Sequence, residues 1–290
     1  MHLGNVMSAL LSWLSVKSKG GEWLLRIEDI DPARSREDYA RLIMDDLQWL
    51  GLPWDGEPLW QSRRSDVYEH YFNVLLSRHL VYPCYCTRAD LLATQAPHES
   101  DGRVVYPGTC RPRGGASDGT QPAPPARPAA QRLMVPDADI SFTDGHYGPQ
   151  TVNLARHVGD FIVRRKDGAW AYQLAVVVDD GLSGISEVVR GRDLLLSSPQ
   201  QIYVAHLLGF QPPQFIHLPL LCNQQGQRLS KRDASMGMDV LRQTTTPTAI
   251  IGRLAWLLGL QPEPQPVTAQ QLLATFSWDR VKTHDIVVAT

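Results

Sequence analysis

An α/β fold is predicted for this chain, and three observations predict it. Its 290 residues, 43% of them apolar, are enough to bury one large core or two modest ones. Eight Trp and nine Tyr with only 20% charged residues are not the composition of a disordered protein. A helix, a short strand and a second helix follow one another over residues 5–49, which is the rhythm of an α/β sheet protein.

The predicted elements are helices with one apolar face and short apolar strands. The first helix ends at Gly20-Gly21, and Ser35 to Asp38 form a capping box that starts the second. The predicted helices cover residues 5–19, 35–49, 65–78, 198–208, 248–258 and 269–276. The predicted strands cover residues 22–28, 81–86, 161–165, 170–178 and 185–190. Between them, residues 112–131 are rich in Pro, Gly and Ala and are expected to form a mobile surface loop.

Charge and apolar patterning exclude several classes of protein. The chain has 28 basic and 30 acidic residues, so any contact with nucleic acid must use local patches. No apolar stretch is long enough to cross a membrane, so a membrane is not expected as a partner. Residues 6–16 have the length of a signal-peptide core but lack a basic leader, and we expect a cytoplasmic protein. The four cysteines are too few for a disulfide scaffold.

The motif His2-Leu3-Gly4-Asn5 opens directly into the first predicted helix. A helix N-terminus offers free backbone N–H groups and the positive end of a dipole, which suits a phosphate. Gly4 permits a close approach to the backbone, and His2 and Asn5 can donate hydrogen bonds. Taken alone, the motif is more often an ordinary capped helix.

A second motif, Arg228-Leu229-Ser230-Lys231-Arg232, lies in a predicted loop. Lys231 and a serine hydroxyl can close over a triphosphate and neutralise the charge that develops as pyrophosphate leaves. Taken alone, a basic loop is more often only a solvated one.

The two motifs in this order resemble the HIGH and KMSKS signatures of class I aminoacyl-tRNA synthetases. The stretch Leu25–Asp31 (LRIEDID) is similar to the LRIEDTD segment of the glutamyl-tRNA synthetase family. Further similar segments follow in the family's order: Trp60–Ser62, Ala171–Ala175, Val178–Asp180, Val189–Asp193 and His217–Leu221. The resemblance implies a Rossmann-type parallel sheet with a zinc-containing insertion and a short C-terminal helical part. The implied parts are residues 1–80 and 151–240 for the two halves of the nucleotide-binding domain, 81–150 for the insertion and 241–290 for the C-terminal helices.

Only residues 233–290 follow the second motif, which leaves no room for an anticodon-binding domain. The chain therefore resembles the shortened branch of the family. That branch activates L-glutamate with ATP without tRNA and transfers it to the queuosine base in the anticodon of tRNA(Asp). The alternatives are a truncated enzyme that charges tRNA(Glu), and an inactive zinc-containing RNA-binding paralogue. A monomer is expected.

The resemblance also implies roles for single residues. Lys231, His2 and Ser230 would act in catalysis, with Mg²⁺ accompanying ATP. Glu28 would hold the ammonium group of glutamate, while Arg190 and Tyr172 would take its side chain. Each has a plainer alternative: Glu28 can pair with Arg26 on the same strand face, and Tyr172 can be core. The implied ATP-binding residues are His2, Gly4, Asn5, Asp193, Leu194, Leu229 and Lys231.

Three cysteines and a tyrosine form the predicted metal site. In the shortened branch a Cys-x-Cys and Tyr-x-x-x-Cys set binds zinc, and the matching residues are Cys84, Cys86, Tyr106 and Cys110. Zinc prefers a tetrahedral, thiolate-rich site. His98 competes with Tyr106 for the fourth position, and without the resemblance the cysteines are equally small buried groups. Cys222 is expected to be buried and inert.

The family's first strand and its RFAPSPTG-like segment precede the HIGH motif, whereas only Met1 precedes His2 here. We expect a miscalled start, which an in-frame search upstream would test, and little or no adenylation from the sequence as it stands. The tRNA surface is poorly specified. The candidate phosphate contacts are Arg63, Arg64, Arg113, Arg127, Arg164, Arg165 and Lys166.

Overall fold

The computed structural model describes residues 1–31, 35–93, 105–112, 127–229 and 237–288. Its α-helices are α1 Leu3–Lys17, α2 Glu37–Trp49, α3 Ser65–Ser77, α4 Arg88–Ala93, α5 Leu154–His157, α6 Tyr172–Leu182, α7 Ser197–Leu208, α8 Met238–Thr244, α9 Pro247–Leu258 and α10 Ala269–Leu272. Its strands are β1 Arg26–Ile27, β2 Leu59–Trp60, β3 Val81–Cys84, β4 Ala130–Leu133, β5 Asp139–Asp144, β6 Gly148–Asn153, β7 Phe161–Arg164, β8 Glu187–Gly191, β9 Gln214–Leu218, β10 Leu221–Cys222 and β11 Ile286–Val287. Short 3-10 helices include η1 Gln61–Arg63, η2 Arg192–Leu194, η4 Leu273–Thr275 and η5 Trp278–Arg280. The expected loop at 112–131 falls largely outside the described residues.

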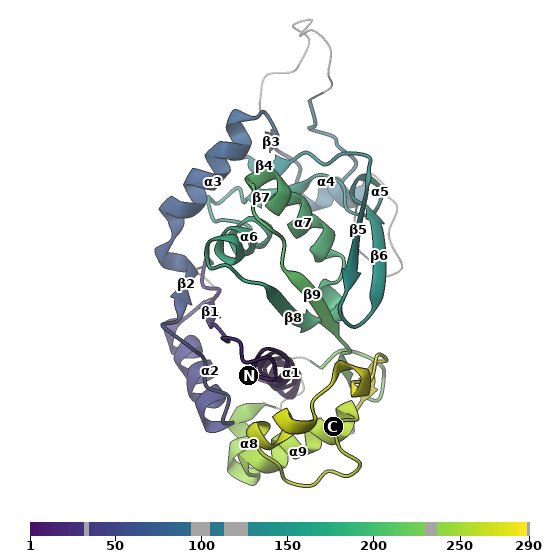
Figure 1. The fold of residues 1–290 in the computed structure, drawn as a ribbon. Helices are drawn as coiled ribbons and strands as arrows, with labels where there is room; N and C mark the ends of the chain where they lie inside the picture. Colours follow the sequence, from purple (N-terminus) through teal and green to yellow (C-terminus); the bar gives the residue numbers. More distant parts are fainter. Residues whose placement is uncertain (32–34, 94–104, 113–126, 230–236, 289–290) are drawn as a thin grey trace, which may run out of the picture.

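Helix α1 is the centre of one hydrophobic core. It is viewed end-on in Figure 1, with β8 above it, α2 to its left and α8 and α9 below. Val6, Leu10 and Leu14 are fully buried, and they pack with residues from α9 and from the chain after α10. The 3.6-residue spacing of these side chains confirms the helix that the sequence predicts. The C-terminal helices therefore complete the hydrophobic environment of α1.

The described parallel strands lie in three separate pairs, not in the single sheet that the resemblance implies, and one of the three joins β10 to β11. β1 pairs with β2 through Arg26 and Leu59, and β8 pairs with β9 from Glu187 opposite Gln214 to Gly191 opposite Leu218. Within the described ranges, no strand is hydrogen-bonded between β1 and β8. The β1–β2 and β8–β9 pairs nevertheless bring Glu28 and Arg190 within electrostatic reach of each other.

Helix α6 corrects one sequence-based prediction. Residues 170–178 are predicted as a strand because they are almost entirely apolar and include three consecutive valines. In the structure α6 begins at Tyr172 and packs against α3 and α7 in a second hydrophobic core. Residues Leu174 to Val178 are all buried, so this helix shows no polar face from which its period could be read.

Other differences are local. Helix α2 begins at Glu37 with Arg36 as its N-cap and no side-chain cap, so the predicted capping box is wrong. The sequence-based prediction also missed the hairpin of β5 and β6, which pair from Asp139 opposite Asn153 to Asp144 opposite Gly148. Strands β3, β4 and β7 form an antiparallel sheet beside it.

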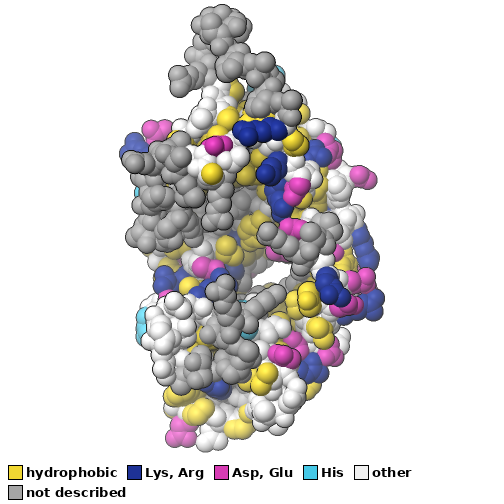
Figure 2. Space-filling model, turned by 180° about the vertical axis from the view of Figure 1, so that it is seen from behind, with side chains coloured by type: hydrophobic (Ala, Val, Ile, Leu, Met, Phe, Trp, Pro, Cys, Tyr) yellow, Lys and Arg dark blue, Asp and Glu magenta, His cyan; other side chains and the backbone are white. Residues whose placement is uncertain are grey.

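The surface carries both signs of charge. Seen from behind, the molecule is hollowed at mid-height, with basic and acidic side chains near the rim (Figure 2). Among the described residues, no helix has the length and the apolar character that a membrane span needs.

Replacing Gly252 with alanine is expected to destabilise the protein. A Cβ at this position of α9 would lie 2.0 Å from the Gln265 carbonyl oxygen, a backbone atom that cannot rotate away. The gain in helix propensity is about 1 kcal/mol, whereas overpacking typically costs about 1–3 kcal/mol. Urea unfolding should give a lower midpoint for Gly252→Ala, while the exposed Gln270→Ala should leave it almost unchanged. An unchanged or higher midpoint for Gly252→Ala would contradict the close approach.

Candidate functional site

The first motif caps α1. The Nδ1 atom of His2 accepts a hydrogen bond from the Gly4 backbone N–H at 3.1 Å, and Asn5 Oδ1 accepts from the His2 backbone N–H at 3.1 Å. This reciprocal cap uses both side chains, so the motif is a helix cap, as the alternative interpretation of the sequence expects. A Cβ at Gly4 would lie 3.1 Å from the His2 ring, and glycine therefore lets the ring fold back over the helix start.

The same residues line a pocket of about 80 Å³ between the start of α1 and the end of β8. Arg228 and Asp193 form an ion pair at its edge. Lys231 and Ser230 lie outside the described residues. The pocket brings together the other residues predicted to bind ATP, which are His2, Gly4, Asn5, Asp193, Leu194 and Leu229.

Arg190, at the fourth position of β8, has a partner at every N–H of its guanidinium. Nη1 donates to Gln201 Oε1 at 2.7 Å and to the Tyr172 hydroxyl at 3.4 Å. Nη2 donates to Ser198 Oγ at 2.8 Å and to the Leu194 carbonyl at 3.5 Å. Nε donates to His217 Nε2 at 3.2 Å. Two of these contacts are long, so they are the ones that a stronger acceptor can displace.

No carboxylate is bonded to Arg190 in the part of the chain that the structure describes. Burial lowers the pKa of its guanidinium, although Tyr172 and Asp180 oppose this effect. Burial likewise raises the pKa of the Tyr172 hydroxyl. A partly buried guanidinium with neutral partners is a site that favours an added carboxylate.

Glu28 carries a charge near this site. Its Oε1 accepts from Arg26 Nη2 at 3.2 Å, as the plainer reading of the shared strand face expects, and its side chain is 43% exposed. Arg26 also pairs with Asp180 of α6. Burial raises the pKa of Asp180 even though Arg26 opposes it. Arg26 thus lies between two carboxylates, those of Glu28 and Asp180.

Several polar residues of the site have weak or no signals of their own in the sequence. Gln201 and Ser198 lie on α7, and their contacts with Arg190 depend on how that helix packs. His217 lies in the segment His217–Leu221, which resembles the family. The resemblance implies no role for the histidine itself. Asp144 lies in the hairpin that the sequence-based prediction missed.

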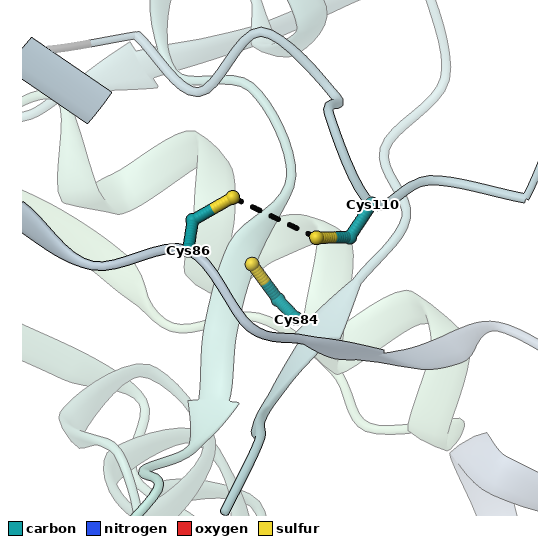
Figure 3. A group of neighbouring side chains, drawn as sticks. All are labelled: Cys84, Cys86 and Cys110. Atoms are coloured by element: carbon teal, nitrogen blue, oxygen red, sulfur yellow. Dashed lines mark hydrogen bonds between the residues drawn. The ribbon is translucent and has the colours of Figure 1, made fainter. Parts of the chain in front are cut away.

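Cys84, Cys86 and Cys110 converge on one point (Figure 3), and their sulfur atoms all lie within 4.8 Å of one another. The Sγ atoms of Cys86 and Cys110 are 3.6 Å apart. Zn–S bonds of about 2.3 Å in a tetrahedron would separate two sulfur atoms by about 3.8 Å. The three cysteines can therefore hold a metal ion with little rearrangement.

Tyr106 lies in the same cluster. Its hydroxyl accepts from Cys84 Sγ at 3.4 Å and from the Cys110 backbone N–H at 2.8 Å, and its ring lies 3.7 Å from the Arg132 guanidinium carbon. His98 lies outside the described residues. Cys222, 4% exposed, is buried away from the cluster as predicted.

The thiols of this cluster differ in acidity. Burial and the hydrogen bond with Cys110 raise the pKa of Cys86 to about 12. Burial opposes ionisation of Cys84 too, but hydrogen bonds with the Tyr106 hydroxyl and the Cys86 backbone lower its pKa. A thiolate-binding metal would offset the burial penalty, which suits zinc.

Known proteins were compared with the whole chain. Residues 1–287 match the family model described as tRNA synthetases class I (E and Q), catalytic domain. A glutamyl-Q tRNA(Asp) synthetase of Nitratidesulfovibrio vulgaris is 43% identical over 99% of this chain and 91% of its own length. One from Neisseria meningitidis serogroup C is 42% identical over 99% of this chain and 95% of its own length.

A solved structure, the glutamate-tRNA synthetase from Elizabethkingia anophelis, superposes with a TM-score of 0.80 at 26% identity. The match covers 99% of this chain, which spans only 65% of the length of that longer protein. The folded core that positions the pocket and Arg190 is thus the catalytic fold of class I synthetases. With a family model matched over residues 1–287 and relatives above 40% identity, the chain belongs to the class I tRNA synthetases of the E and Q type, in the branch of the glutamyl-Q tRNA(Asp) synthetases.

Proposed function

We propose that this chain activates glutamate with ATP, without tRNA, and transfers the glutamyl group to queuosine in tRNA(Asp). The observation that carries the proposal is sequence identity over nearly the whole chain. Glutamyl-Q tRNA(Asp) synthetases are 43% and 42% identical to this chain, whereas the glutamate-tRNA synthetase is 26% identical. The family membership supports a synthetase, and the higher identity supports the glutamyl-Q branch.

Recognition of glutamate rests on Arg190. Its guanidinium is partly buried and has only neutral partners among the described residues, so the side-chain carboxylate of glutamate would supply the missing negative charge. The Tyr172 hydroxyl, 3.4 Å from Nη1, lies where it can share that carboxylate. Glu28 holds the ammonium group in this proposal. The paired opposite charges select an amino acid with an acidic side chain.

ATP occupies the pocket at the start of α1. The glutamate α-carboxylate attacks the α-phosphorus, pyrophosphate leaves, and a nucleophile of the queuosine base then takes the glutamyl group and releases AMP. His2, Gly4 and Asn5 hold phosphate oxygens at the helix N-terminus. Asp193, Leu194 and Leu229 contact the nucleotide, and Lys231 with Ser230 stabilises the departing pyrophosphate. Mg²⁺ would accompany ATP and would neutralise part of the phosphate charge.

Zinc has a structural role in this proposal. Cys84, Cys86 and Cys110 supply thiolates, and the Tyr106 hydroxyl completes the set. The metal would join the end of β3 to the segment around Cys110. Cys86 and Cys110, which would be ligands on the two sides, are 24 residues apart in sequence. No step of the reaction is assigned to it.

Glutamate-dependent exchange of pyrophosphate into ATP tests the proposal. Exchange without any tRNA is expected from the product of the reading frame extended upstream, because glutamate and ATP are the only substrates of the first step in this proposal. Exchange that requires tRNA(Glu) would instead indicate a truncated glutamyl-tRNA synthetase, and no exchange would indicate an inactive RNA-binding paralogue. The assay should be run on this chain and on the product of the reading frame extended upstream. Glutamate transfer to tRNA(Asp) with and without queuosine then tests the acceptor.

A further inference from the structure

A buried carboxylate–imidazole pair lies directly behind Arg190. Asp144 ends β5, and His217 lies in β9 opposite Arg190 of β8. The His217 Nδ1 and Asp144 Oδ2 atoms are 2.6 Å apart, and both side chains are 0% exposed. The family resemblance assigns no role to either residue, and neither residue lines the ATP pocket.

The partners of this pair determine where its proton lies. A carboxylate only accepts hydrogen bonds, so His217 Nδ1 must carry the proton. Burial opposes ionisation of Asp144, but hydrogen bonds from His217 and from the backbone of Tyr147 and His146 lower its pKa, so it is a carboxylate at neutral pH. Arg190 Nε only donates, at 3.2 Å, so His217 Nε2 must accept. The chain of contacts therefore requires one tautomer of a neutral imidazole.

We infer that Asp144 and His217 are positioning residues for glutamate recognition, because they fix the tautomer whose Nε2 lone pair orients the guanidinium of Arg190. The inference rests on the glutamate-binding role proposed for Arg190. It explains why a hairpin from another part of the chain reaches the β8–β9 pair. The turn after Asp144 also contacts β9 through His146 Nδ1, which lies 2.9 Å from the His217 carbonyl. The fixed tautomer leaves the two outer guanidinium nitrogens to the partners already described, of which the Tyr172 hydroxyl and the Leu194 carbonyl make the long contacts.

Asp144→Asn tests this inference with little change in shape. Oδ1 of Asp144 accepts the backbone N–H groups of His146 and Tyr147, at 3.0 and 2.9 Å, so the amide oxygen must stay there. The amide nitrogen then replaces Oδ2 and donates to His217 Nδ1. His217 is driven to the opposite tautomer, with an N–H facing the N–H of Arg190. A substitution of this kind at a histidine-orienting aspartate is known to impose the wrong tautomer.

The expected result is a rise of roughly 10- to 100-fold in KM for glutamate, with KM for ATP changed less than about twofold. Pyrophosphate exchange measures both constants, and ¹⁵N shifts of the His217 ring report its tautomer directly. Thermal unfolding checks that the variant folds. Asp137→Asn, an exposed aspartate that precedes the same hairpin and pairs with Arg156, is the matched control and should leave both constants unchanged.

Arg190→Met distinguishes a failure of the proposed glutamate site from a failure of the positioning role. If it leaves glutamate KM unchanged, the proposed glutamate site is wrong. If it raises glutamate KM while Asp144→Asn has no effect, or shifts ATP and glutamate constants equally, the positioning role is wrong and the pair only joins the hairpin to β9. In the double variant, Asp144→Asn should add less than twofold to the effect of Arg190→Met, because its action passes through that side chain.

Discussion

Arg190→Met is expected to lower kcat/KM for glutamate by roughly 10²- to 10⁴-fold, because two charge-assisted hydrogen bonds of about 1.5–3 kcal/mol each are lost. Methionine keeps an unbranched apolar stem and removes the guanidinium with its charge. Gln201 and Ser198, which accept at 2.7 and 2.8 Å, would lose their donor. Glutamate-dependent pyrophosphate exchange measures the effect, and the larger part should appear in KM for glutamate.

Two further variants sharpen this result. Arg190→Lys keeps the charge but not the planar fork, so its kcat/KM for glutamate should lie between those of the wild type and Arg190→Met. Arg192 lies two residues away, with Nε 2.6 Å from Asp285 and a side chain that is 46% exposed. Arg192→Met should change kcat/KM less than about threefold, since an exposed pair contributes about 0–1 kcal/mol. Equal losses for Arg190→Met and Arg192→Met would contradict a specific carboxylate site.

Cys86→Ala is expected to release the bound metal and destabilise the part of the chain around β3. The protein should contain about one zinc per chain when it is purified without chelator, and the variant should contain almost none. Zinc binding is worth about 10–16 kcal/mol in zinc-finger peptides, so even a fraction of that energy exceeds a typical core mutation. Metal content by mass spectrometry and thermal unfolding with and without a chelator measure both effects.

Cys222→Ala is the matched control for the metal site. Cys222 is as buried as Cys84, at 4% against 3% exposed, but its sulfur lies near Asp285 and outside the cluster. It should keep the metal and respond to chelator as the wild type does. Tyr106→Phe then tests the fourth position, because it removes only the hydroxyl. A full zinc content in Cys86→Ala would contradict the three-cysteine site.

The local sequence determined those helices that have one buried face or clear end signals. Helices α1, α3, α7 and α9 follow a 3.6-residue apolar pattern or clear end signals, and their predicted ranges agree with the structure to within about two residues. Cys84, Cys86 and Cys110 were recognised from their spacing and resemblance, because the ligands of a small metal site lie close together in sequence. The grouping of residues at the pocket beside α1 was predictable for the same reason, since each motif is a short segment at a helix or strand end.

Only the tertiary structure decided the rest. Residues 174–180 of helix α6 are all buried, so no exposed polar face marks it as a helix, and packing against α3 and α7 overrides the strand preference of its valines. Asp144 and His217 are 73 residues apart, and nothing near either one in the sequence marks the other as its partner. Local patterns record which face of an element is buried, whereas a buried polar contact depends on how distant elements pack. The residue types proposed to bind glutamate therefore occur in the motifs, whereas the orientation of Arg190 depends on the fold.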